Sequence, residues 1–168
     1  GRFTSMLNTE LRVKSGLTYG ARSAIERASQ PGPAVISSFT KTETTKAAID
    51  LAIATLDRLH KDGLDAATIE SAKRYVAGQY APGLETAPQL AAQLVDMTMY
   101  GDSREVVDGY LGTIAAATPA QIAEARKVFP DSKDLVVVAI GDAAKIRDVM
   151  KGYGPLTEMK LTDPRFSP

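Results

Sequence analysis

The sequence contains no cysteine and no tryptophan, and it has a single histidine, His60, among its 168 residues. The absence of cysteine excludes disulfides, thiolate catalysis and every zinc site with cysteine ligands. One histidine cannot supply the paired histidines of H-E-x-x-H or H-x-x-E-H, so the chain cannot build such a site by itself. His60 lies where a helix is predicted to end. We interpret it there as a partner for the helix dipole and free carbonyls rather than as a ligand or base.

An excess of charge of one sign is also missing, because 20 Lys and Arg balance 20 Asp and Glu. The sequence therefore has no basic excess that would point to nucleic acid, and it has no acidic tail. The most apolar run, residues 135–140, is far shorter than the roughly 20 residues that span a bilayer, so no membrane span is predicted. The chain begins at Gly1, almost directly in a helix and without a signal peptide. We therefore expect an upstream portion of the protein to precede it.

The remaining composition, 44% hydrophobic and 24% charged, is typical of a globular domain with a core. Apolar periodicity, capping residues and turn residues divide the chain into segments. The predicted elements are a helix at 3–15, strands at 17–25 and 35–42, helices at 43–60, 65–80, 86–100, 103–116 and 119–129, a strand at 134–140, a helix at 143–151 and a short edge strand at 157–161. This segregated order predicts an α+β fold, with an antiparallel sheet packed against several helices, and a single domain over residues 1–168.

Two predicted elements carry specific structural expectations, one on burial and one on a helix start. The strand at 134–140 is apolar on both faces, so we expect it to be buried. Thr118-Pro119-Ala120-Gln121 is a capping box with proline at the first helical position, which predicts a helix start at that point.

Arg12 and Tyr19 are the candidate functional residues. Arg12 lies on the last turn of the first helix and Tyr19 at the start of the next strand, so the corner between them can bring the two side chains together. A guanidinium fork and a phenol hydroxyl are donors that can hold a peptide carbonyl or a developing oxyanion. The residues alone leave a structural role open, in which Arg12 caps the helix end and Tyr19 packs with its hydroxyl at the surface.

The segment Phe3–Gly20 resembles the R/Y motif of the pitrilysin/insulysin-type zinc metallopeptidases, the inverted H-x-x-E-H family that includes mitochondrial processing peptidase. The shared pattern is F-T-S-x-L-x-x-x-L-R followed by G-L-x-Y, and it places Arg12 and Tyr19 at the matching positions. The later steps Tyr100-Gly101, Thr118-Pro119 and residues 136–142 agree with the family in layout. Because the zinc motif is absent, the chain resembles the non-catalytic, C-terminal-type half, lacking the first strands of that half-domain.

The resemblance implies a mitochondrial processing peptidase-like half-domain that works with a homologous zinc-bearing half, in the same polypeptide or in a separate subunit. Zinc is then expected on the partner half, and this chain binds no cofactor. Tyr19 would donate a hydrogen bond to the scissile carbonyl as it becomes an oxyanion, and Arg12 would hold a nearby substrate carbonyl or orient Tyr19. Substrates would be peptides or small unfolded proteins.

Two other functions stay open at this point. The chain could be a catalytically inert scaffold subunit, or a peptide-binding module without a cleaving partner. The bacterial relatives that the resemblance implies are often exported, so we expect a periplasmic or secreted protein, with the cytoplasm as the alternative.

Overall fold

The computed structural model describes residues 2–25, 27–30, 32–129 and 131–163. Its strands, β1 and β2, pair antiparallel, and helices surround them, so the predicted α+β class is confirmed. The elements are α1 (Met6–Asn8), the π-helix η1 (Thr9–Lys14), β1 (Ala21–Ile25), β2 (Ala34–Ser38), η2 (Thr42–Thr44), α2 (Thr45–Asp62), α3 (Ala66–Tyr80), η3 (Ala81–Leu84), α4 (Ala87–Tyr100), α5 (Arg104–Asp108), α6 (Tyr110–Ala116), α7 (Pro119–Ala125), η4 (Arg126–Val128) and α8 (Ala143–Lys151).

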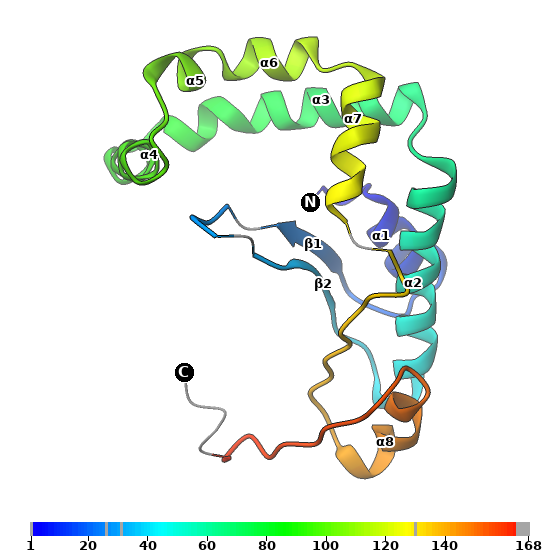
Figure 1. The fold of residues 1–168 in the computed structure, drawn as a ribbon. Helices are drawn as coiled ribbons and strands as arrows, with labels where there is room; N and C mark the ends of the chain where they lie inside the picture. Colours follow the sequence, from blue (N-terminus) through cyan, green and yellow to red (C-terminus); the bar gives the residue numbers. More distant parts are fainter. Residues whose placement is uncertain (1, 26, 31, 130, 164–168) are drawn as a thin grey trace.

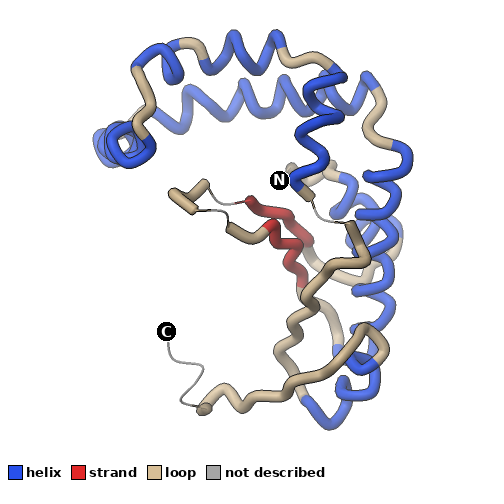
Figure 2. The backbone as a smooth tube through the Cα atoms, in the orientation of Figure 1, coloured by secondary structure: helices blue, strands red, loops and turns tan. Residues whose placement is uncertain are grey.

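The helices form an open, C-shaped frame around the hairpin (Figures 1 and 2). Helix α2 is the spine of the frame, and α1 and η1 pack on it. Helices α3 and α6 run side by side as an upper arm that ends at α4, while α8 packs at the lower end of α2. The β1–β2 hairpin projects from the spine into the concave side of this frame.

The apolar core lies along α2. The buried apolar side chains among the described residues are Leu11, Ala21, Ala48, Leu56, Ile69, Ile146 and Met150. Leu11, on η1, has an exposed fraction of 0%. Full burial of a leucine stabilises a fold by about 1.5–3 kcal/mol. This core therefore holds the N-terminal segment, which carries Arg12, against the spine.

Local capping signals in the sequence are confirmed. The side chain of Ser5 accepts the amide of Asn8, and that of Asp65 accepts the amide of Thr68. Helices α4 and α7 both begin with a complete capping box, each with a proline in the first turn. Each cap satisfies amides that a helix start otherwise leaves unpaired, which is why these boundaries can be predicted from sequence.

The single helix predicted over 103–116 is wrong, because the segment forms α5 and α6 with a break at Gly109. The amide of Gly109 donates to the carbonyl of Glu105 at 2.8 Å. A Cβ atom at position 109 would lie 2.8 Å from that same oxygen, so this close turn requires glycine.

The strand predicted at 134–140 is also wrong, since this segment is extended without a strand partner in the described part of the chain. Its apolar side chains are not buried: Val136 is 92% exposed, Val138 78% and Ile140 76%. An isolated extended segment cannot form a ladder, whatever its composition, because each backbone group needs a neighbouring strand. The short edge strand predicted at 157–161 is absent for the same reason.

Both hairpin strands are shorter than predicted, because hydrogen bonds to the preceding helix replace ladder bonds. The amides of Leu17 and Thr18 both donate to the carbonyl of Leu11, at 3.0 and 3.2 Å. The hydroxyl of Thr40 donates to the carbonyl of Leu17 at 2.6 Å. The paired register therefore runs only from Ala21 opposite Ser38 to Ile25 opposite Ala34.

Candidate functional site

The helix that carries Arg12 widens into the π-helix η1. The amide of Ser15 donates to the carbonyl of Glu10, five residues back, at 3.2 Å. Because a π-turn takes one more residue than an α-turn, the side chains after Thr9 are rotated from the positions that an α-helix would give them. Single π-turns are rare and are frequent at functional sites.

Gly16 turns the chain back toward the helix. Its φ is +64°, a left-handed conformation that favours glycine. The next two amides bind the end of η1 through the carbonyl of Leu11. The corner therefore returns Tyr19 to the side of the helix that carries Arg12.

Arg12 and Tyr19 are in contact, as predicted. The Arg12 Cζ atom lies 4.4 Å from the centroid of the Tyr19 ring and 4.6 Å from that of Phe3. The guanidinium is thus held between two aromatic rings, and each such cation–π contact at an exposed site stabilises by about 0.5–1 kcal/mol. Tyr19 is 74% exposed, and Arg12 is half-buried beneath the two rings. Within the described residues no carboxylate forms an ion pair with Arg12.

A buried polar network holds this corner in place. Asn8 Oδ1 accepts the amide of Ala21 at 2.8 Å, which joins the helix to the first ladder residue. The Thr18 hydroxyl donates to the carbonyl of Gly20 at 2.9 Å and accepts from Ser38 Oγ at 3.0 Å. Asn8 and Thr18 are each only 8% exposed, so these bonds form in a low-dielectric setting where they are strong. Tyr19 is therefore flanked by fixed backbone.

An ion pair anchors η1 to the spine. Glu10 Oε1 accepts from Lys14 Nζ and from Arg58 Nη2, both at 2.9 Å. These hydrogen bonds, from Lys14 first and then Arg58, hold the pKa of Glu10 below its ordinary value. The Arg58 contact links η1 to α2 across 48 positions of sequence.

Comparison with known proteins addresses the same segment. Residues 1–76 match the family model described as the peptidase M16 inactive domain. A crystal structure of a peptidase M16 inactive domain from Pseudomonas fluorescens superposes with a TM-score of 0.71 at 24% identity, over 79% of this chain and 31% of that chain. The fold is that of a peptidase M16 inactive domain. No curated protein matches the chain.

The family match covers the F-T-S helix and the G-L-x-Y corner, and the solved M16 inactive domain shares the fold of this chain. The family match includes Arg12 and Tyr19, while the structural match extends to most of the chain. The chain spans less than a third of the solved M16 inactive domain that it matches.

Within residues 2–25, 27–30, 32–129 and 131–163, no three His, Asp or Glu side chains gather as metal ligands would. His60 lies in the last turn of α2, the helix end at which the sequence placed it. None of the described helices of this M16-type fold is long and apolar enough to cross a membrane.

Proposed function

We propose that this chain is the non-catalytic half of a zinc metalloendopeptidase, in which Arg12 and Tyr19 contact the substrate opposite a zinc site carried by a partner half. The observation that carries the proposal is the exposed contact between the two side chains, 4.4 Å from guanidinium carbon to ring centroid. It lies in the segment that matches the M16 inactive domain. The partner half, in the same polypeptide or in another, would supply the zinc and its bound water.

Tyr19 has the chemistry of an oxyanion donor. Its phenol O–H is a single donor on a ring that contacts the Arg12 guanidinium. A donor aimed where negative charge develops stabilises the transition state more than the substrate, so it raises kcat. Arg12 adds N–H groups that suit a second peptide carbonyl, and its positive charge also favours the oxyanion.

Substitution of Tyr19 by phenylalanine in the assembled enzyme tests this role. Phenylalanine keeps the ring over Arg12 and removes only the hydroxyl. We expect kcat for peptide cleavage to fall about 100- to 1,000-fold, as for loss of one oxyanion donor, with KM little changed. The measurement is steady-state hydrolysis of a fluorogenic peptide by the two halves together.

The matched control is Tyr153→Phe, which removes a hydroxyl that donates to Asp50 on the far end of α2. Its kcat should equal that of the wild type. An unchanged kcat in Tyr19→Phe, or an equal loss in both variants, excludes the oxyanion role. Cleavage that never appears with a zinc-bearing half, or that survives chelation, would favour an inert scaffold or a different chemistry.

The location is part of the same proposal. Following the resemblance to exported bacterial peptidases, we place the enzyme in the periplasm or outside the cell. Fractionation of the source cells, with immunodetection of this chain, tests that placement.

A further inference from the structure

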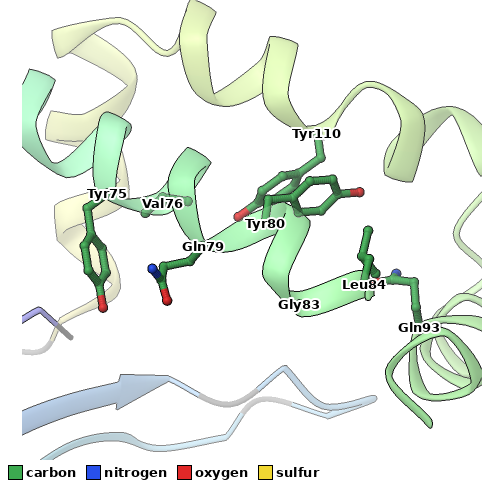
Figure 3. A pocket seen from close by; sticks show the side chains of 8 residues that line it. All are labelled: Tyr75, Val76, Gln79, Tyr80, Gly83, Leu84, Gln93 and Tyr110. Carbon is green, nitrogen blue, oxygen red and sulfur yellow. The ribbon is translucent and has the colours of Figure 1, made fainter. Parts of the chain in front are cut away.

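A cavity of about 310 Å³ opens on the upper arm, among α3, η3, α4 and α6 (Figure 3). This volume is at the small end of the range for ligand pockets, about 300–1,000 Å³, and suits one large side chain rather than a cofactor. In Figure 3, Tyr75 and Gln79 point to the side on which the hairpin ribbon lies. The cavity therefore opens on the concave side of the molecule.

One wall of the cavity is a fixed aromatic surface. The Tyr80 and Tyr110 rings stack with centroids 4.6 Å apart and planes at 21°. The Tyr80 hydroxyl donates to the carbonyl of Val107 at 2.8 Å, which fixes the ring before any ligand arrives. Aromatic ligand rings pack favourably on such preformed surfaces.

The polar part of the lining is neutral. Gln79 comes from α3 and Gln93 from α4, and among the residues that the structure describes no Asp, Glu, Lys or Arg side chain lines the cavity. Each primary amide offers both a donor and an acceptor, which matches the donor and acceptor of a peptide group. A charged ligand would lose its hydration here without gaining a counter-charge.

The hairpin runs from the Arg12–Tyr19 corner to the C-terminal end of α4, the helix that carries Gln93 of the cavity lining. At the corner end, Asn8 binds the first residue of β1. At the other end, the carbonyl of Arg27 accepts from the Tyr100 hydroxyl at 2.8 Å, and Arg27 pairs with Asp102 beyond α4. Tyr19 and Arg27 are eight positions apart. In extended chain eight positions cover roughly 26 Å, so a peptide laid along the hairpin reaches from the corner to the arm.

We propose that the cavity is a binding site for an aromatic side chain of an uncharged peptide segment, with the glutamine amides holding the flanking peptide groups. The identity of that peptide as a substrate rests on the proposed function, while binding itself does not. In a substrate, the aromatic residue lies several positions away from the bond that faces Tyr19, because the hairpin separates the corner from the upper arm. The site would thus give the enzyme a preference for substrates with an aromatic residue far from the bond that is cleaved.

The direct test is titration of the ¹⁵N-labelled chain with capped tripeptides, followed by amide chemical shifts. We expect acetyl-Gly-Phe-Gly-amide to shift amides of α3, η3 and α6, and acetyl-Gly-Glu-Gly-amide to leave them unchanged. Gln79→Ala and Gln93→Ala should each weaken binding at least fivefold, as judged from the titration curves. Arg74→Ala, an exposed α3 residue outside the lining, is the matched control and should bind like the wild type.

Equal shifts from both tripeptides, shifts outside the cavity, or full affinity in both glutamine variants overturn the proposal. Two variants on different helices guard against loss through misfolding, which amide dispersion reports in the same spectra. In the assembled enzyme, Gln79→Ala should raise KM only for substrates with the distant aromatic residue, whereas Tyr19→Phe lowers kcat for all substrates. Tripeptide binding needs no zinc-bearing half. The cavity proposal and the proposed role of Tyr19 are therefore tested by separate measurements, and either can fail without the other.

Discussion

At the scale of single residues, the Arg12 guanidinium contacts two aromatic rings, those of Tyr19 and Phe3. The positive charge lies 4.4 Å from the Tyr19 centroid and 4.6 Å from that of Phe3. A lysine would supply the charge but not the planar group that stacks between rings, nor the fork of N–H donors. The contact that orients the Tyr19 ring therefore depends on arginine at position 12.

Glu10 gives a pH-dependent prediction at the same scale. Its pKa is below the ordinary 4.5, because Lys14 and Arg58 donate to the carboxylate. A carboxyl with a depressed folded-state pKa adds stability that is complete above its unfolded pKa, about 4.3, and is lost as pH falls through the folded value. We expect Glu10→Gln to lower the free energy of unfolding at pH 7 by about 1 kcal/mol at most, since the partner Arg58 is partly exposed.

Urea unfolding at several pH values measures this effect. The difference between Glu10→Gln and the wild type should be constant from pH 7 to about 5 and should vanish below the folded pKa. Glu124→Gln, which removes an exposed i,i+3 contact between Glu124 of α7 and Lys127 of η4, is the control and should change little. A difference that persists undiminished at pH 2 would show that the carboxylate contacts are not its cause.

Sequence reasoning found Arg12 and Tyr19 but not Asn8 and Thr18. The first two are marked by their spacing and by the resemblance, and Gly16 marks the corner between them. Asn8 and Thr18 carry no such mark, since an amide or hydroxyl in a helix or loop is ordinarily exposed. Both are buried by contacts at the start of the hairpin, where Asn8 binds the amide of Ala21 and Thr18 binds Ser38, partners that are distant in sequence.

At the scale of elements, the hairpin and α4 are joined by a clasp that consists of Arg27, Tyr100 and Asp102. Arg27 makes a two-pronged contact with Asp102, at 2.5 and 2.9 Å, and its Cζ lies 4.2 Å from the Tyr100 ring centroid. The hydrogen bond from Arg27 keeps the pKa of Asp102 below its usual range. Since β1 and β2 form a two-stranded sheet, which is only marginally stable alone, this clasp is an important support for the hairpin.

Asp102→Asn should therefore loosen the hairpin. The amide side chain keeps the shape but removes the charge, and we expect amide hydrogen exchange in β1 and β2 to accelerate about two- to fivefold. Because the pair is exposed, added salt should raise wild-type exchange toward the variant's rate. Asp108→Asn breaks a comparable surface pair with Arg104 on α5 and should leave the hairpin unchanged. Unaltered exchange in Asp102→Asn would mean that the ring contacts suffice.

Elements whose ends are marked by local chemistry were predictable, and elements that depend on distant partners were not. The caps at Ser5, Asp65, Thr86 and Thr118 act within three residues, so sequence alone locates them. The apolar segment at 134–140 has the composition of a buried strand, but a ladder needs a neighbour that composition cannot supply.

The whole molecule exposes much of its apolar side-chain surface, because its core is confined to the spine. Exposed apolar side chains include Val136, Val138 and Ile140 and the α4 residues Leu94 and Met99, each more than 60% exposed. Burying these side chains on folding contributes little, because they remain largely in water. Only the buried apolar residues along the spine therefore contribute much to the free energy of unfolding.

The last prediction follows from the difference between the buried core along α2 and the exposed apolar side chains. Val138→Thr changes a side chain that is 78% exposed, so the free energy of unfolding should change by less than about 0.5 kcal/mol. Ile146→Thr changes one that is 8% exposed in the contact between α8 and the spine, and should destabilise by about 2 kcal/mol or more. Binding of an apolar dye should fall in the first variant and rise in the second, because the first removes exposed surface and the second loosens the core. Equal destabilisation by the two substitutions would place residues 134–140 in the core after all, and the division between spine and open surface would then be wrong.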